Sequence, residues 1–150
     1  MANTYTSLTY HVIFSTKKRE PVLDQSTCER LWPYLGGIAR ENEMKALEVG
    51  GASDHVHMLL SVPPTLALPK AIQLIKGGSS HWVKSHFPKL PSFAWQDGYA
   101  AFTVSESNVD AVRSYIRDQP EHHRKRSFIE EYRALLRKHK VAFDEKYLLG

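Results

Sequence analysis

The sequence predicts an α+β fold built on one antiparallel sheet. Four short segments have the composition and alternation of strands, and two longer segments between them carry apolar residues at helical spacing. The order is strand, helix, strand, strand, helix, strand, without a series of parallel β-α-β units, and two more helices follow. This order is typical of ferredoxin-like (RRM-like) topology, in which helices cover one face of the sheet and the other face is available.

The first strand and the first helix follow from local pattern. Residues 7–16 alternate as a strand, which places Val12 and Phe14 on the same face. Asp24 is the expected N-cap of a helix whose apolar residues recur with a period of 3.6. Pro33 lies inside this pattern and should kink the helix, because proline removes one helical hydrogen bond.

Two strands and a second helix come next. Residues 45–49 predict a short strand, followed by a turn at Gly50-Gly51. Residues 54–62 form the clearest strand of the chain, which Pro63-Pro64 ends. Apolar residues then return at helical spacing over residues 68–82, which predicts the second helix.

The last third of the chain predicts one strand and two helices. Residues 98–104 form the strand, and Ser107 is the expected cap of a helix that Pro120 ends. Ser127-Phe-Ile-Glu130 is a capping box that opens a final amphipathic helix. The residues of this helix expected to face inward are Phe128, Tyr132, Leu135 and Leu136.

Length and composition indicate a single domain spanning residues 1–150. Hydrophobic residues make up 42% and charged residues 24%, which excludes a disordered chain. No apolar run approaches the roughly 20 residues of a membrane span, no export signal is visible, and the single cysteine, Cys28, cannot form an intrachain disulfide. We therefore expect a cytoplasmic protein without a membrane partner.

The positive charge is concentrated near the C-terminus. The whole chain has a formal net charge of +4, but residues 113–140 contain 9 Lys or Arg and 4 Asp or Glu, a net of +5. The remaining residues therefore sum to −1. This distribution fits a localised surface that faces a polyanion, and on charge alone it fits a solvated helix face equally well.

His55-Val56-His57 lies in the clearest predicted strand. Alternation sends Val56 into the core and both histidines to the opposite face, where two imidazoles suit one divalent cation. By itself the pattern equally describes two exposed polar residues on the open face of a sheet. Tyr115 and Gln119 lie four residues apart on a predicted helix, which makes them neighbours on one face that is free to look across at the sheet.

Taken in order, these motifs make the chain resemble the single-tyrosine HUH transposases of compact bacterial insertion sequences and their REP-associated relatives. The resemblance spans most of the chain. Each segment alone is weak evidence for the family, whereas five segments in the family's order are specific evidence. The segments are His11-Val-Ile-Phe with Lys17-Lys18-Arg19 and Pro21-Val22-Leu23, Asp54-His-Val-His-Met-Leu-Leu-Ser61 with Pro63, Lys76-Gly77-Gly78-Ser79-Ser80, Trp95-Gln-Asp-Gly-Tyr99, and Tyr115-Ile-Arg-Asp-Gln119.

The resemblance implies a site and a reaction. His55 and His57 would be metal ligands, Gln119 the third ligand and Tyr115 the nucleophile. The family cleaves single-stranded DNA by tyrosine attack on a phosphodiester, which leaves a 5′-phosphotyrosine and a free 3′-OH, so religation needs no nucleotide cofactor. It uses Mg²⁺ or Mn²⁺ and recognises hairpins near the element's ends. The resemblance also implies a homodimer in which the tyrosine helix of one subunit can complete the site of the other. It implies a bacterial cytoplasmic protein that associates with the nucleoid when bound to DNA.

Elementary chemistry agrees with these roles. A phenol with a pKa near 10 is only about 0.1% ionised at pH 7, a handicap of roughly 4 kcal/mol. A cation held by two imidazoles and one amide stays fully divalent and could stabilise charge on the phosphate. No general base is identified from the sequence. A structural zinc site is disfavoured because Cys28 is the only thiol.

Several side chains are candidates for DNA contact. His122-His123 is interpreted as a solvated pair at a helix end, and His11 as structural. The candidates for phosphate contact lie in the glycine-containing segment and around the tyrosine helix, and they are Lys76, Ser79, Arg113, Arg117, Arg124, Lys125 and Arg126.

Three other functions remain open on the sequence. A domesticated relative would process or bind repeated hairpins without mobilising itself. A non-catalytic ferredoxin-like module would bind RNA or DNA without a covalent product. A two-histidine phosphodiesterase would need a second His-x-Ser/Thr motif, which neither His11-Val-Ile nor His81-Trp-Val supplies.

Overall fold

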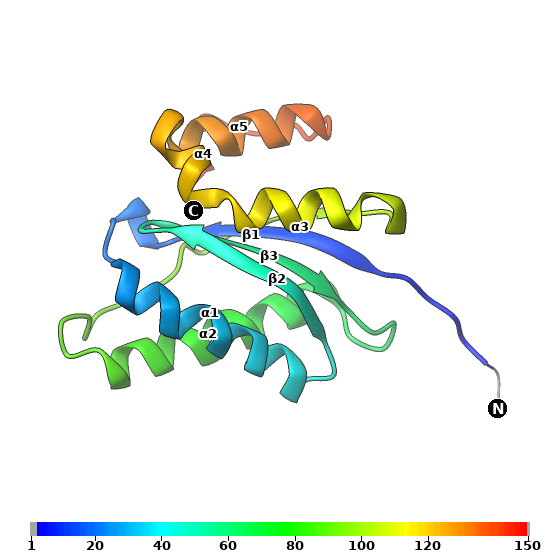
Figure 1. Cartoon of the computed structure of the whole chain (residues 1–150), viewed down its shortest axis with the longest axis horizontal. Coiled ribbons are helices and arrows are strands. Elements are labelled where there is room, and N and C mark those ends of the chain that lie inside the picture. Colours follow the sequence, from blue (N-terminus) through cyan, green and yellow to red (C-terminus); the bar gives the residue numbers. More distant parts are fainter. Residues whose placement is uncertain (1–2, 150) are drawn as a thin grey trace.

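The computed structural model describes residues 3–149 and contains one four-stranded antiparallel sheet (Figure 1). The strand order β2-β3-β1-β4 confirms the predicted α+β fold of ferredoxin-like topology. Residues 1–2 and 150, the ends of the predicted single domain, lie outside the described residues. The strands are β1 (Thr9–Ser15), β2 (Lys45–Ala52), β3 (His55–Ser61) and β4 (Ala100–Thr103).

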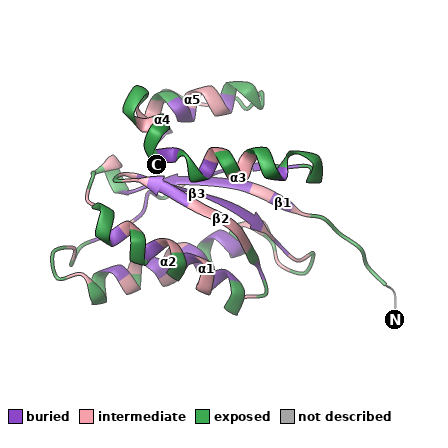
Figure 2. Cartoon of the chain, viewed as in Figure 1, coloured by how far each residue is buried: buried purple, intermediate pink, exposed green. Residues whose placement is uncertain are grey.

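Helices α1 (Gln25–Glu41) and α2 (Leu68–His86) cover one face of the sheet and close the larger core (Figure 2). The predicted alternation is confirmed there, because alternate residues of β1 and β3 point into this core. The strand residues that pack against the two helices are Val12, Phe14, Val56, Met58 and Leu60.

The C-terminal helices occupy the face that the first six elements leave open (Figure 1). They are α3 (Val109–Arg117), α4 (Gln119–Lys125) and α5 (Phe128–Lys138). On β3, Leu59 packs under α3 with Ile116, which is fully buried. The residues of α5 that pack on β1 and β4 are Phe128, Tyr132 and Leu136, against Ile13, Ala100 and Phe102. The sheet is therefore the middle layer of three.

Two of the three predicted helix caps are confirmed. Asp24 Oδ1 accepts a hydrogen bond from the backbone N–H of Thr27 at 2.8 Å, and the Ser127 hydroxyl accepts from the N–H of Glu130 at 3.3 Å. Ser107 is not a cap, because Glu106–Asn108 forms a short 3₁₀ turn and the Ser107 hydroxyl lies 3.1 Å from that of Ser105.

The expected turn at Gly50-Gly51 is wrong, since both glycines lie within β2. A Cβ atom on Gly50 would lie 2.5 Å from the carbonyl oxygen of Ile116 in α3. Glycine is needed here so that the tyrosine-bearing helix can approach the sheet closely.

The helix expected to run to Pro120 is two helices. α3 ends at Arg117 and α4 begins at Gln119, with Asp118 between them and Pro120 in the first turn of α4, where proline costs no hydrogen bond. The four-residue spacing predicted that Tyr115 and Gln119 share one helix face. This prediction is wrong, because the two residues lie on different helices. Within residues 3–149, no helix is long and apolar enough to cross a membrane.

Candidate active site and metal centre

His55 and His57 lie side by side on β3 and face the C-terminal helices. Both side chains are fully buried, with 0% exposure. The interpretation of two exposed polar residues on an open sheet face is therefore wrong, because α3, α4 and α5 cover that face. Two buried imidazoles need polar partners, and their partners define the site.

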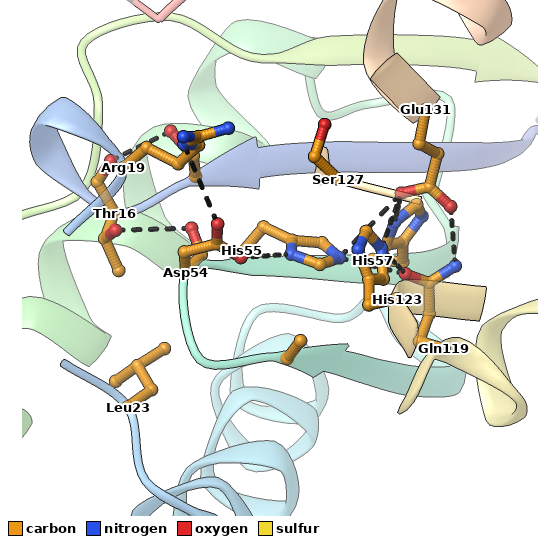
Figure 3. A network of polar contacts seen from close by, with 12 residues as sticks. Thr16, Arg19, Leu23, Asp54, His55, His57, Gln119, His123, Ser127 and Glu131 are labelled. Atoms are coloured by element: carbon orange, nitrogen blue, oxygen red, sulfur yellow. Dashed lines mark hydrogen bonds and ion pairs between the residues drawn. The ribbon is translucent and has the colours of Figure 1, made fainter. Parts of the chain in front are cut away.

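Each of the two histidines has a partner on its Nδ1 atom. Nδ1 of His55 lies 2.8 Å from Oδ1 of Asp54, whose other oxygen lies 3.9 Å from Nε of Arg19 (Figure 3). Nδ1 of His57 lies 2.7 Å from Nε2 of His11 on the neighbouring strand β1. Such partners fix the orientation of an imidazole and leave Nε2 for other bonds.

The Nε2 atoms point to polar groups supplied by α4 and α5 (Figure 3). Nε2 of His55 lies 2.9 Å from Oε1 of Gln119, which also lies 2.9 Å from Nε2 of His123. Oε1 of Glu131 lies 3.1 Å from Nε2 of both His57 and His123. One nitrogen or oxygen from each of His55, His57, His123 and Glu131 falls within 4.8 Å of the others.

Tyr115 reaches the same cluster from α3. Its hydroxyl donates a hydrogen bond to Oε2 of Glu131, and Nε2 of Gln119 donates to the same oxygen at 2.9 Å. The two carboxylate oxygens thus divide their partners, with Oε1 facing the histidines and Oε2 facing Tyr115 and Gln119. A tyrosine, two histidines and a glutamine from β3, α3 and α4 converge on one carboxylate within a single chain.

Burial and hydrogen bonding set the charges of this network. Burial raises the pKa of Tyr115, and the hydrogen bond to the carboxylate raises it further. Burial also pushes the pKa of Glu131 upward, but the hydrogen bonds from His123 and His57 outweigh it and hold this pKa well below its usual range. Burial lowers the pKa of His57 to about 4. At neutral pH the site therefore contains an ionised carboxylate, a neutral His57 and a protonated phenol.

The donor set fits a divalent cation. Neutral imidazole nitrogens and a carboxylate oxygen are common metal ligands, and here they converge in a buried position that already carries one negative charge. Cys28 takes no part, because its sulfur lies near the carbonyl oxygens of Leu23 and Ala52. Four side chains other than cysteine can supply ligands, so the single thiol does not exclude zinc.

Four residues of this site were missed by sequence reasoning. His11 and Asp54 hold the rings of His57 and His55, and His123 and Glu131 place further donor atoms that could hold a metal ion beside them. The interpretation of His123 as a solvated residue is wrong, because only 12% of its side chain is exposed. Glu131 carried a usable signal, since it follows Phe128 by three residues and so shares the inward face of an amphipathic helix.

The predicted cationic residues divide into two groups around this site. Nε of Arg113 and Nη2 of Arg117 lie 3.5 and 3.2 Å from Oε1 of Glu48, and Nη1 of Arg124 lies 3.4 Å from Oε1 of Glu121. Lys125 and Arg126 are exposed and line a cavity of about 510 Å³, here called the polar cavity. Its other lining residues are Tyr115, Asp118, Glu121, His122, His123 and Glu131.

Lys76 and Ser79 lie away from this site and are engaged within the chain. The ammonium group of Lys76 donates to the carbonyl oxygens of Gln96, Asp97 and Gly98 at 2.7, 3.3 and 2.6 Å, and burial lowers its pKa to about 8. The hydroxyl of Ser79 is buried, donates to the carbonyl of Ile75 and accepts from the indole of Trp95. Contact with DNA phosphates at these two residues stays a prediction.

A ferredoxin-like sheet that presents two adjacent histidines to a tyrosine from a following helix defines the class of single-tyrosine HUH transposases. Comparison with known proteins identifies the family within that class. The chain belongs to the IS200-like transposase family, whose profile matches residues 4–119. The match includes the two histidines and Tyr115 and ends at Gln119, so His123 and Glu131 lie beyond it.

Individual relatives agree with this family. The ISDra2 transposase TnpA of Deinococcus radiodurans is 32% identical over 117 residues, which cover 75% of this chain and 84% of the relative. The transposase of insertion sequence element IS200 from Salmonella typhimurium is 27% identical over 126 residues, covering 81% and 82%.

Two solved structures resemble the chain. A crystal structure of a candidate transposase from Deinococcus radiodurans R1 has a TM-score of 0.65 and 30% identity, covering 79% of this chain and 96% of the other. A REP-associated tyrosine transposase bound to a REP hairpin has a TM-score of 0.60 and 15% identity, covering 82% and 73%, and this likeness concerns the fold.

Proposed function

We propose that this transposase cleaves and rejoins single-stranded DNA with Tyr115 as the nucleophile and a divalent cation held by His55, His57 and Gln119. Residues 1–150 would form one catalytic domain. One observation carries the proposal: the Tyr115 hydroxyl, the Gln119 amide and Nε2 of His57 all hydrogen-bond one buried carboxylate, Glu131. The nucleophile and the ligand atoms are thereby held together before any substrate arrives.

The reaction is a transfer of the phosphoryl group between two oxygens. As the phenol oxygen of Tyr115 bonds to phosphorus, its proton moves along the existing hydrogen bond to Oε2 of Glu131. The bond from phosphorus to the 3′ oxygen breaks, and Glu131, whose low pKa makes it a poor resting place for a proton, passes that proton on to the 3′ oxygen to leave a 3′-OH. The 5′-phosphotyrosine keeps the bond energy, so attack by a 3′-OH reverses the step without a nucleotide cofactor.

The network supports a role for a bound cation. Burial and the neighbouring carboxylate both disfavour a phenolate at Tyr115, so these residues alone oppose ionisation of the nucleophile. A bound divalent cation supplies Lewis-acid stabilisation of the charge that develops on the phosphate oxygens. Because His123 and Glu131 add an imidazole and a carboxylate to the donors inferred by resemblance, the site favours Mn²⁺ over Mg²⁺.

We propose a DNA hairpin with a single-stranded flank as the substrate. Lys125 and Arg126 beside Tyr115 support a polyanion at the polar cavity, and a protein with a similar fold has been solved with a REP hairpin. A homodimer stays part of the proposal. In that dimer Tyr115 would complete either the site of its own chain, where it contacts Glu131, or that of the partner subunit, as the family resemblance implies.

Formation of a covalent protein–DNA adduct tests the proposed function. Hairpin DNA from the gene's own locus is incubated with the protein and Mn²⁺, and adducts that survive denaturation are measured. The wild type should form the adduct, while Tyr115→Phe and a sample treated with chelator should not. Undiminished adduct with Tyr115→Phe overturns the nucleophile, and binding without any adduct in the wild type indicates a non-catalytic DNA-binding module.

A mixing experiment tests whether Tyr115 serves the histidines of its own chain (cis) or those of the partner subunit (trans). Neither Tyr115→Phe nor His57→Ala chains should form adduct alone, and a mixture of the two should stay inactive if the tyrosine acts in cis. Recovery of adduct in the mixture means that the tyrosine of one subunit serves the histidines of the other.

A further inference from the structure

A second cavity, of about 370 Å³, adjoins Tyr115. It is here called the apolar cavity, and it lies between α3 and α5 above β4. Residues at the N-terminal end of α3 and the C-terminal end of α5 line it, whereas the polar cavity is lined by residues that follow Tyr115. The apolar cavity thus lies on the side of Tyr115 toward the start of α3, and the polar cavity on the side toward α4. Within residues 3–149, Tyr115 is the only residue that lines both of these cavities.

The apolar cavity has the chemistry of a site for a planar ring. The ring of His139 stacks on that of Phe102, with centroids 4.0 Å apart and an interplanar angle of 12°. The side chains of Val112 and Leu135 form apolar walls. Flat aromatic surfaces flanked by aliphatic side chains bind nucleobases by stacking, which every base allows.

The mouth of the apolar cavity suits the charge of a nucleotide. Lys138 and Asn108 are exposed residues that line it, so Lys138 places one cation at the cavity. Of the side chains described as lining it, none is acidic. The polar cavity, in contrast, is lined by three carboxylates and, apart from the ring of Tyr115, by no large hydrophobic side chain. The apolar cavity therefore offers the better match to an uncharged base.

We propose that the apolar cavity binds the base of a nucleotide next to the scissile phosphate of single-stranded DNA. The inference rests on the proposed function, in which that phosphate meets the Tyr115 hydroxyl. A strand held there must leave on both sides of Tyr115, and the two cavities are the openings at that position. The cation site lies on the polar side, where Lys125 and Arg126 can contact the sugar–phosphate chain, while one adjacent base enters the apolar cavity and fixes the position of the strand at the cleavage point.

Photocrosslinking locates the base directly. Tyr115→Phe protein, which keeps the DNA intact, is bound to hairpin DNA that carries 5-iodouracil at one flank position at a time, and crosslinked peptides are identified by mass spectrometry. One position beside the scissile phosphate should crosslink to the peptide containing Phe102 or that containing His139. Crosslinks from every flank position to residues 118–126, and none to these peptides, overturn the proposal.

Filling the cavity gives a second measurement with a matched control. Ala111→Trp adds an indole to the lining of the cavity, and Ser114→Trp adds the same group at an exposed residue one turn along the same helix that does not line the cavity. Ala111→Trp should weaken DNA binding about tenfold, the order of one base–aromatic stack, and should have no effect on DNA that is abasic at the crosslinking position. Equal weakening by both variants, or of both DNAs, contradicts a base pocket.

The two proposals fail separately. Crosslinking and binding need no cleavage, so a pocket can be demonstrated even if the wild type forms no adduct. Adduct formation in the wild type, together with crosslinks confined to the polar cavity, leaves the transposase chemistry intact and removes the base pocket.

Discussion

The two faces of the sheet are built from the same strands, but only one of them carries a buried polar network beside its apolar contacts. On β3, Met58 enters a core closed by α1 and α2, while its neighbour His57 enters a polar network closed by α3, α4 and α5. Both side chains are fully buried. The face under α1 and α2 is held by apolar burial. The other face combines two smaller apolar clusters with the polar network, whose burial is possible because, in the part of the chain that the structure describes, every buried side-chain nitrogen or oxygen has a hydrogen-bond partner. Neighbouring residues of β3 can therefore be used to separate effects on stability from effects on chemistry.

The sharpest test replaces the two neighbours on β3. His57→Ala should reduce adduct formation by about 10³-fold, as expected when a group that acts in the transition state is removed. Its circular-dichroism spectrum should remain that of a folded protein. Met58→Ala should lower the free energy of unfolding by about 2–5 kcal/mol through the cavity it leaves, with unchanged adduct yield per folded molecule. A collapsed spectrum for His57→Ala would show that the histidine face is structural.

The next largest effect is expected at the carboxylate of α5. Glu131→Gln should slow adduct formation about 10²-fold, since it removes the acceptor of the Tyr115 proton. Its Mn²⁺ affinity, measured by calorimetry, should fall about 10–100-fold. Glu130→Gln changes the adjacent exposed carboxylate and should leave both quantities within about twofold, as is usual for an exposed surface residue. Equal effects of the two substitutions would remove Glu131 from the site.

The histidine face should also make the stability of the metal-free protein depend on pH. Burial lowers the pKa of His57 to about 4 and that of His11 to about 3, while unfolded histidine titrates near 6.5. Below pH 6.5, His57 and His11 become protonated in the unfolded chain but stay neutral in the folded chain. The free energy of unfolding should therefore be highest above that pH and fall toward pH 4, by up to about 1.4 kcal/mol per pH unit for each histidine.

Denaturant unfolding at several pH values measures this slope. His57→Gln should flatten it between pH 6.5 and 4, whereas His81→Gln, which changes an exposed histidine on α2, should not. Glu131 has a lowered pKa, so its contribution is present above pH 4.5 and is lost only at lower pH. An unchanged slope in His57→Gln would contradict the buried neutral imidazole.

The smallest effect concerns the cations on either side of the molecule. The affinity for single-stranded hairpin DNA should fall steeply with salt, because phosphate contacts release counterions. Replacing both Lys125 and Arg126 with alanine should reduce the log–log salt slope by about 1.4, since each contact to a single strand contributes about 0.7. The matched pair Lys84→Ala and Lys89→Ala changes the opposite side of the molecule and should leave the slope unchanged. A flat wild-type response contradicts the C-terminal segment as the DNA face.

Local pattern predicted much of the fold. The alternation of β1 and β3, the Asp24 and Ser127 caps and the order of the six core elements are all short-range features, and the structure confirms them. The errors had two sources. Gly50 lies in a strand that α3 approaches closely, a tertiary contact that local pattern does not show. Pro120 begins a helix instead of ending one, because the first turn of a helix accepts proline as readily as the residues after its end.

The sequence by itself determined which face of the sheet His55 and His57 share, which family the chain resembles and which tyrosine is the candidate nucleophile. These follow from periodicity and motif order, which a linear chain displays directly. Only the tertiary structure revealed that Glu131, 74 residues from His57, accepts hydrogen bonds from both His57 and Tyr115. Periodicity tells which face a side chain is on, but not which distant element covers that face, and the burial that gives Glu131 and His123 their partners exists only once the C-terminal helices have packed on the sheet.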